Sequence, residues 1–445
     1  MRELAERAVA EAMRRGASAA ECVLRRGREL SVTVRMGATE SIQQAEGKAL
    51  GLRVFKGRQA GVTHSSDWDW PAVSAMLDAA LAIAEASSDD PAAGLPRPDE
   101  LGQHQGEMQL YDPAVAAVTP EQALAWAQRA ERAALDCDPR INNSNGASFE
   151  AGEATKVLCN SLGFYGELRR SSCSLSVAPI AEQDGAKQRD WWYTVARGPQ
   201  GLEAPEIVGR TAAARTLRRL GARKVATARV PVVFDPRTAR SLLGHVLEAA
   251  SGEAVYREAS FLAGALGKDI AAPALTLVDD GRLPGALGSA PFDAEGVPTR
   301  RTVIVGEGRL QSYLLNCYAA RKLGLATTGN AARGLAGAPG VSCGNLTLLP
   351  GGQSPEQMLS GICQGLYLTE LIGFGFNAVT GDYSRGASGM WIEQGALAYP
   401  VEEITVAGNL KEMLRQVVAI GNDLEIRGAV NAPTLCIDGM TVAGH

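Results

Sequence analysis

The sequence of 445 residues predicts an α+β fold, in which two N-terminal α/β units with antiparallel sheets precede a β-rich C-terminal domain. In the first half, helical segments are separated by runs where apolar and polar residues alternate, which is typical of half-buried strands. Most of the 50 glycines lie after residue 201, which favours turn-rich β structure there. The apolar fraction of 46% and the charged fraction of 21% are those of an ordinary globular protein.

The first unit is predicted over residues 1–95. Its opening stretch, MRELAERAVAEAMRRG, has one apolar stripe among charged residues and lacks the apolar core of a signal peptide, so we expect a surface helix. The other expected elements are strands over residues 30–36 and 50–54, a turn at Lys56-Gly57 into a strand ending near His64, and a helix from about Pro71 to Ala86.

The second unit is predicted over residues 118–226, after a stretch rich in Pro, Gly and acid at 89–118 that we expect to be a linker or a surface excursion. Thr119-Pro120-Glu121-Gln122 has the spacing of a capping box with Pro at the first helical position, so a helix begins there. The other expected elements are strands over 156–159 and 173–177, a hairpin turn at Asp184-Gly185, and a basic helix over about 205–220.

The third unit, residues 230–445, is predicted to be mostly β structure. It begins with a short buried strand over 230–234, and Asp235-Pro236 then caps a helix that carries His245. The other expected elements are hairpin turns at Gly306-Glu307-Gly308 and Gln394-Gly395, and a helix that begins at Ser354 and ends at Gly365.

Charge and cysteine use exclude several classes of protein. The net charge is -5 and no Lys/Arg run forms a phosphate-binding stripe, so we expect no nucleic-acid ligand. No run of 18 apolar residues occurs, so we expect no membrane span. Eight cysteines are scattered without CxxC pairs in a chain without an export signal, which predicts reduced thiols and a cytoplasmic location.

Only four histidines are present, and His64, His104 and His445 lie in no metal-binding pattern. His245 falls outside the apolar stripe of its helix, beside Ser241 and Glu248. A helical zinc site needs a glutamate next to the first histidine and a second histidine one turn on, whereas Val246, Ala249 and Ala250 follow here. We therefore predict that His245 is an ordinary histidine of a polar helix face.

Other catalytic signatures are incomplete. Gly386-Ala387-Ser388-Gly389 begins like GxSxG, but Met390 replaces the last glycine, and no Ser-x-x-Lys occurs. GALGKD lacks the Ser/Thr that follows Gly-Lys in a P-loop. A mechanism that uses a pair of carboxylates remains an alternative, although the sequence does not point to a particular pair. The sequence thus predicts no catalytic residue and no metal ligand.

Four segments carry a resemblance to a known family. They are SGEAVYREASFLAGALGKDI (251–270), TTGNAARG (327–334), LYLTELIGFGFNAVTGDYSRGASGMWIEQG (366–395) and ITVAGNLKEMLRQVVAIGNDLEIR (404–427). Together they resemble the PmbA/TldE branch of the TldD/PmbA family (peptidase U62, modulator of DNA gyrase).

The resemblance implies a cytoplasmic heterodimer in which a TldD-type partner binds zinc through a His-Glu-x-x-x-His helix and a downstream cysteine. In that family the heterodimer cleaves unfolded or leader-bearing peptides, including a microcin precursor and an antitoxin. Here the helix over 237–250 lacks the glutamate and the second histidine, and the link after Gly421-Asn422-Asp423-Leu424 has no cysteine. We therefore expect no cofactor on this chain and zinc on the partner.

The stretch GDYSRGASG is predicted to line a β wall that grips an extended, unfolded peptide through strand addition. Glycines at 381, 386 and 389 would let backbones approach closely. An alternative is that the glycines only form a tight β-corner and that Asp382 and Arg385 form a structural ion pair. Asn330 and Arg333 in TTGNAARG have the same two interpretations, peptide binding or a structural role. The candidate peptide-binding residues are Asp382, Tyr383, Ser384, Arg385, Asn330 and Arg333.

Two other functions stay open. The chain could be a stand-alone homodimeric metallopeptidase that combines His245 with a donor from another chain. It could also be a non-enzymatic, peptide-binding regulator.

Overall fold

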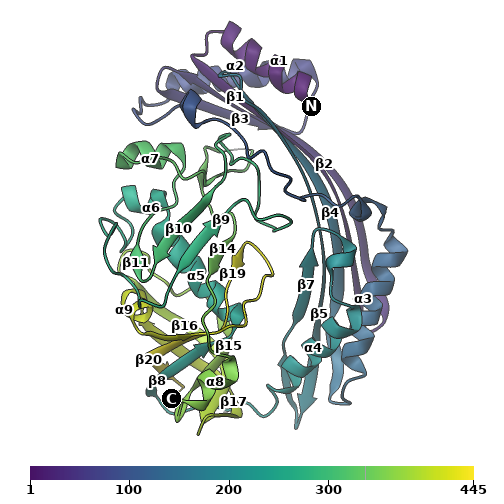
Figure 1. Ribbon diagram of the computed structural model, residues 1–445. Coiled ribbons are helices and arrows are strands. Elements are labelled where there is room, and N and C mark those ends of the chain that lie inside the picture. Colours follow the sequence, from purple (N-terminus) through teal and green to yellow (C-terminus); the bar gives the residue numbers. More distant parts are fainter. Residues whose placement is uncertain (336, 445) are drawn as a thin grey trace.

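The computed structural model describes residues 1–335 and 337–444. Figure 1 shows a long curved sheet along one side of the molecule, with the C-terminal half on its concave side. The architecture is a mixture of helices and mainly antiparallel sheets, as predicted. No helix of the described residues is long and apolar enough to cross a membrane.

The long sheet is continuous through both N-terminal units, because β1 pairs antiparallel with β2 on one side and with β4 on the other. Its strand order is β3-β2-β1-β4-β5-β6, and β7 also pairs with β5. The strands are β1 (Ala19–Arg35), β2 (Ala38–Lys56), β3 (Gln59–Ser65), β4 (Ile141–Asn160), β5 (Tyr165–Gln183), β6 (Ala186–Arg189) and β7 (Trp192–Ala196).

Four of these strands are 17 to 20 residues long, so the short strands expected from the sequence are only parts of them. The alternation fails elsewhere because both faces of the sheet are solvent-exposed there. Residues 38–48 of β2 are almost all exposed, whereas residues 50–55 are buried. A strand that is exposed to solvent on both faces shows no alternation of apolar and polar residues, so the sequence pattern does not predict it.

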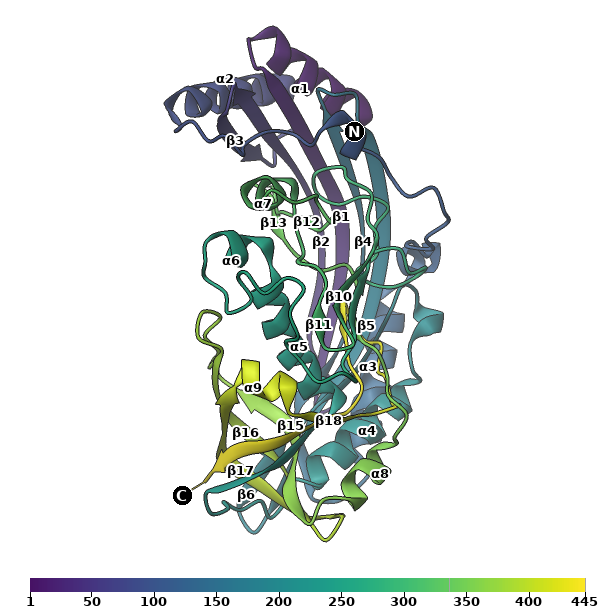
Figure 2. The same cartoon turned by 60° about the vertical axis from the view of Figure 1, so that its left-hand side comes forward.

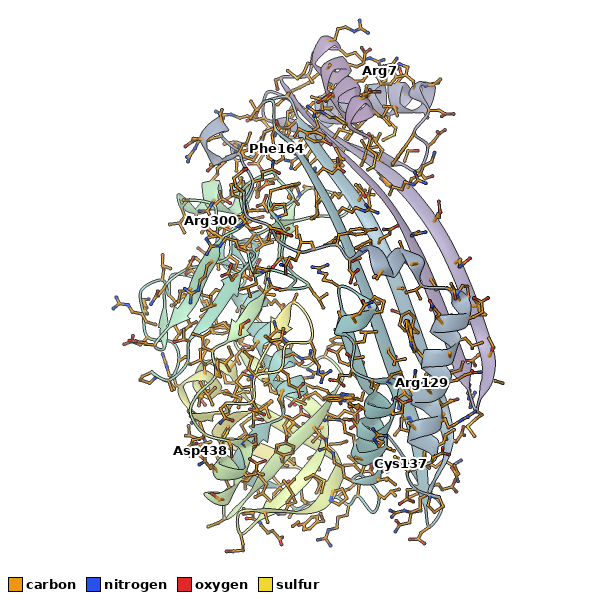
Figure 3. The ribbon with its side chains drawn as sticks, turned by 45° about the vertical axis from the view of Figure 1, so that its right-hand side comes forward. Arg7, Arg129, Cys137, Phe164, Arg300 and Asp438 are labelled. Atoms are coloured by element: carbon orange, nitrogen blue, oxygen red, sulfur yellow. The ribbon has the colours of Figure 1, made fainter. Side chains whose placement is uncertain are left out.

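Helices cover only the two ends of the long sheet, which gives it two separate cores. At one end α1 and α2 pack on β1 to β3, and at the other α3 and α4 pack on β4 and β5. Arg129 of α3, labelled in Figure 3, pairs with Glu206 of α4 at 2.8 Å. The helices are α1 (Arg2–Arg14), α2 (Trp70–Ala86), α3 (Pro120–Leu135) and α4 (Pro205–Leu217).

Residues 87–119 form a strap that crosses between the sheet and the C-terminal half, not a free linker. The strap contains the 3-10 turns η1 (Pro98–Glu100) and η2 (Pro113–Ala117). Met108 and Leu110 are buried in a cluster with Phe164 and Phe292, whose ring centroids are 5.3 Å apart. Phe164 is labelled in Figure 3, in the region where the sheet meets the C-terminal half.

Two larger sheets, a two-stranded sheet and five helices of the described residues form the C-terminal half. One sheet has the order β17-β16-β15-β8-β20-β18 and is partly closed because β17 also pairs with β20; the other has the order β11-β10-β9-β14-β19, and β12 pairs with β13. The strands are β8 (Ala228–Phe234), β9 (Leu277–Asp280), β10 (Arg301–Gly306), β11 (Arg309–Leu310), β12 (Ala331–Ala332), β13 (Gly340–Val341), β14 (Leu346–Leu348), β15 (Gln364–Ile372), β16 (Asp382–Glu393), β17 (Ala396–Asn409), β18 (Val417–Ile420), β19 (Val430–Asn431) and β20 (Leu435–Ala443). The helices are α5 (Pro236–Ala250), α6 (Gly252–Tyr256), α7 (Cys317–Leu323), α8 (Pro355–Ser360) and α9 (Leu410–Arg415). The second unit also contains a 3-10 turn, η3 (Pro199–Gly201).

Local turn and cap signals are confirmed. Asp184, Glu307 and Gln394 have φ of 53°, 52° and 50°, and each precedes a glycine that also has positive φ, as a two-residue hairpin turn requires. Thr119 forms the expected capping box. The helix expected from Ser354 to Gly365 is wrong at its end, because α8 stops at Ser360 and β15 begins at Gln364.

Buried ion pairs fasten the C-terminal half to both ends of the long sheet. At one end Arg215 of α4 contacts Asp190 at 3.3 Å and Asp235 at 3.0 Å. At the other end Arg333 donates to Glu21 of β1 at 2.6 Å. The two halves therefore form one body, and residues from both can contribute to one site.

Candidate functional site

The candidate site is built on α5, the helix that carries His245. β8 lies between β15 and β20 in the six-stranded sheet, and Asp235 follows it directly. The Asp235 carboxylate accepts the Thr238 backbone N–H at 2.9 Å, which caps α5 where it leaves the sheet. The buried side of α5 includes Leu242, Leu243 and Val246.

His245 does not face solvent, so the expectation of an ordinary polar-face histidine is wrong about its surroundings. Its side chain is 17% exposed. The imidazole lies 4.5 Å from the ring of Phe376 and 5.9 Å from the ring of Tyr383, measured between centroids. The segment between β15 and β16, together with β16 itself, covers this helix face, which periodicity within the helix cannot reveal.

Arg385 places a positive charge beside His245. Its Nη1 donates to the Ser241 hydroxyl at 2.7 Å, one turn of α5 before His245. Burial, and then the Arg385 charge, lower the pKa of His245 to about 4. The imidazole is therefore neutral at pH 7, and its 4.0 Å contact with Glu248 is not an ion pair at that pH.

Several polar atoms of this cluster are buried without a hydrogen-bond partner. They are Nε2 of His245, the hydroxyl of Tyr383 and Nε of Arg385. Tyr383 is only 2% exposed, and burial raises its pKa to about 12. Buried polar groups are normally paired. The group of Ser241, His245, Phe376, Tyr383 and Arg385, called here the α5 cluster, is therefore a buried polar group whose hydrogen-bonding capacity the chain does not fill.

The α5 cluster does not fit a metal ion. Neutral imidazole is a good ligand, but His245 is its only donor of the kind zinc prefers, and the adjacent Arg385 guanidinium repels a cation. Among residues 1–335 and 337–444, no group of three or more His, Cys, Asp or Glu side chains could hold a metal ion. Cys436 is buried in β20.

The stretch predicted to grip peptide splits between two faces of β16. Tyr383 and Arg385 turn toward α5, whereas Asp382 and Ser384 are exposed. Asp382 accepts from the Thr380 hydroxyl at 2.6 Å and the Asn409 amide at 3.1 Å. The alternative of an Asp382–Arg385 ion pair is wrong, because residues three apart on a strand lie on opposite faces.

Asn330 and Arg333 lie away from the α5 cluster, with partners inside the chain. The Asn330 amide donates to Asp279 at 2.7 Å and to the Ser342 carbonyl at 3.1 Å. Arg333 pairs with Glu21, 312 residues earlier in the chain. A peptide-binding role for the candidates on β16 and in TTGNAARG stays a prediction.

Sequence reasoning missed the exposed apolar loop that joins β15 to β16. Ile372, the last residue of β15, is 56% exposed; in the loop itself Val379 is 53% exposed and Phe374 is fully exposed. The same loop carries Phe376 into the α5 cluster. Large exposed apolar side chains gathered on one segment make it a candidate contact site for another molecule. The signal available in the sequence was GFGF, two aromatic residues in a glycine-rich stretch where no strand pattern requires them.

Family models match most of the chain in three segments. The descriptions are PmbA/TldA metallopeptidase domain 1 at residues 20–84, the central domain at 113–220 and the C-terminal domain at 227–444. The chain belongs to the PmbA/TldD metallopeptidase family. The sequence-based assignment to this family is therefore confirmed.

Individual relatives of the PmbA/TldD family match over the full length. The metalloprotease PmbA of Escherichia coli O157:H7 is 40% identical over 447 residues, covering 100% of this chain and 97% of the relative. The PmbA homolog of Haemophilus influenzae is 37% identical and covers 100% and 96%. A crystal structure from Bacteroides thetaiotaomicron, described as a modulator of DNA gyrase, has a TM-score of 0.92 at 28% identity, covering 100% of this chain and 99% of that chain.

Proposed function

We propose that this chain is the PmbA/TldE-type subunit of a cytoplasmic TldD/PmbA-type peptidase, and that zinc and the hydrolytic step belong to a TldD-type partner. The observation that carries the proposal is the donor set of the α5 cluster. A single neutral histidine beside a guanidinium does not suit a bound cation, since the fixed positive charge of Arg385 lies near the imidazole and repels a cation.

The role of the chain would be to hold unfolded peptide for its partner. Asp382 and Ser384, the exposed candidates on β16, would offer polar contacts to the peptide backbone. Phe374, Ile372 and Val379 offer apolar contact that does not depend on a specific peptide sequence. This combination suits extended, unfolded or leader-bearing peptides such as a microcin precursor or an antitoxin.

A cytoplasmic location is supported by the cysteines. All eight are free thiols, and five are buried. Free thiols persist in a reducing compartment.

A second candidate is a stand-alone homodimeric metallopeptidase, which the name metalloprotease PmbA of the E. coli relative favours. It would need His245 as a ligand together with donors from a second copy. The two candidates differ in what His245 does, so the same substitution tests both.

The test measures zinc content and cleavage of an unfolded peptide by the chain alone, by a TldD-type chain alone, and by their mixture. Each is repeated with His245→Ala and with the control His64→Ala, since His64 is exposed on β3. We expect no stoichiometric zinc on the lone chain and cleavage only when the TldD-type chain is present. His245→Ala should then change the cleavage rate less than about tenfold, because no ligand is lost.

Stoichiometric zinc on the lone chain, with cleavage abolished by His245→Ala but not by His64→Ala, would overturn the proposal in favour of the homodimeric peptidase. Peptide binding without cleavage in every mixture would favour the non-enzymatic regulator.

A further inference from the structure

A cavity of about 410 Å³ lies where the first unit, the strap and the C-terminal half meet, apart from the α5 cluster. Figure 2 shows α6 and α7 between α5 and the end of the sheet that carries α1 and α2. β2 and the turn after it supply Arg53, Phe55 and Arg58, and the C-terminal half supplies Tyr256 and Tyr318. This volume is in the usual range for a small-molecule site, about 300–1,000 Å³.

Aromatic side chains form part of the cavity wall. The rings of Tyr256 and Tyr318 meet edge to face, with centroids 5.7 Å apart. Phe55 is buried, and the Arg53 guanidinium lies 5.0 Å from its ring centroid. A ligand in this cavity would therefore bury apolar surface against aromatic rings.

The acidic groups of the cavity have partners inside the chain. Asp90 accepts from the Tyr318 hydroxyl at 2.6 Å and from Lys322 at 2.8 Å. Glu253 pairs with Arg257 at 3.0 Å. Glu295 is buried and accepts the Cys317 backbone N–H at 2.8 Å, and burial raises its pKa. These three acidic side chains therefore already have partners within the chain, so they do not favour a cationic ligand.

The groups without full partners are guanidiniums. Arg53 is 7% exposed and shares the Glu21 carboxylate with Arg333, each at 2.6 Å, and the buried Glu295 carboxyl also lies near the Arg53 charge. Nη2 of Arg53 is buried without a hydrogen-bond partner. Arg58 is exposed, and its side chain makes no ion pair with any residue that the structure describes. The hydrogen-bond donors left unpaired at this cavity thus belong to guanidinium groups.

We propose that this cavity binds a small carboxylate with an aromatic or apolar side chain. The carboxylate would meet Arg58 and Arg53, since guanidinium and carboxylate form strong, paired hydrogen bonds. The apolar part would lie against Tyr256 and Tyr318. Such a group is found on an N-blocked amino acid and at the C-terminus of a peptide. The inference does not depend on the proposed function, because it concerns binding and not cleavage.

Isothermal titration of the full chain tests the inference with N-acetyl-phenylalanine and with the amide of N-acetyl-phenylalanine, which lacks the carboxylate. A longer N-blocked peptide ending in phenylalanine, with a free or an amidated C-terminus, distinguishes the two sources. We expect the free acids to bind and both amides to bind at least tenfold more weakly, since a charged hydrogen bond is lost. Binding of the peptide acid but not of N-acetyl-phenylalanine would identify a peptide C-terminus as the ligand.

Variants connect the binding to the cavity. Arg58→Gln should weaken binding of the acid about tenfold, and Tyr256→Leu several-fold. Arg189→Gln is the matched control, because Arg189 is an exposed arginine at the far end of the long sheet, on β6. Acid and amide of equal affinity, no detectable heat with either acid, or equal affinities of the Arg58→Gln and Arg189→Gln proteins would each overturn the proposal.

Discussion

Arg385 on β16 donates a 2.7 Å hydrogen bond to Ser241 on α5 and thereby holds its guanidinium beside His245. The two residues are 144 positions apart in the chain. This contact gives the α5 helix a fixed positive charge beside a neutral imidazole.

Arg385→Gln should raise the pKa of His245 from about 4 toward the ordinary value of 6.5. The rise should be partial, because burial is the larger cause of the depression and the substitution leaves it in place. Titration of the histidine ring resonances by NMR measures it, with His245→Gln used for assignment. An unchanged pKa would show that the Arg385 charge does not reach the imidazole.

His245 should make stability depend on pH. Its pKa is lower in the folded chain, about 4, than the ordinary 6.5. Between these values the unfolded chain binds more protons, so the free energy of unfolding falls as the pH falls through this window. Urea unfolding at several pH values should show a flatter dependence for His245→Gln than for wild type. His64→Gln, at an exposed position, should keep the wild-type slope.

Glu21→Gln should lower the free energy of unfolding by about 3–5 kcal/mol, because it leaves Arg53 and Arg333 buried without their counter-charge. The midpoint of urea unfolding measures the loss. Glu40→Gln is the control, since Glu40 is exposed on β2 and should change stability by less than about 0.5 kcal/mol. Equal effects of the two substitutions would contradict a stabilising role of the buried Glu21 carboxylate.

Gly389 and Gly386 provide a matched pair on β16. A Cβ at Gly389 would lie 2.2 Å from the Tyr367 carbonyl oxygen, whereas one at Gly386 would meet its nearest atom at 3.4 Å. Gly389→Ala should therefore destabilise the protein by about 1–3 kcal/mol, and Gly386→Ala by less than about 1 kcal/mol. Thermal unfolding compares them, and the reverse order would contradict the packing of β15 against β16.

Phe374→Ser should leave the free energy of unfolding within about 0.5 kcal/mol of wild type, since the side chain is fully exposed. Under the proposed function it should weaken binding of an unfolded peptide several-fold, because an aromatic anchor is lost. Fluorescence anisotropy with a labelled peptide measures this. Leu162→Ser, at an exposed leucine in the turn between β4 and β5, is the control. Equal peptide affinities would remove the β15–β16 loop from the proposed site.

Much of the fold was predictable because its signals are local. The capping box at Thr119, the Asp235 cap and the hairpin turns at Asp184, Glu307 and Gln394 each depend on a few adjacent residues. Strand lengths in the long sheet were not predictable, because a strand that faces water on both sides shows no alternation.

The candidate site was only partly predictable for the same kind of reason. The helix pattern of α5 placed His245 off the apolar stripe, but only the fold shows that Phe376 and Tyr383 cover that face. GDYSRGASG was predicted to grip peptide, which stays a prediction, and only the structure shows that Tyr383 and Arg385 of this stretch lie beside α5. Its division into an inward pair, Tyr383 and Arg385, and an outward pair, Asp382 and Ser384, follows from the register of β16.

The sequence by itself determined the helix caps, the turns, the family resemblance and the single histidine on α5, since these depend on residue identity and short spacing. Only the tertiary structure decided that Arg385 lies beside His245 and that Arg53 and Arg333 share Glu21. Contacts between residues 144 or 312 positions apart depend on how whole sheets pack, and no local pattern encodes that packing.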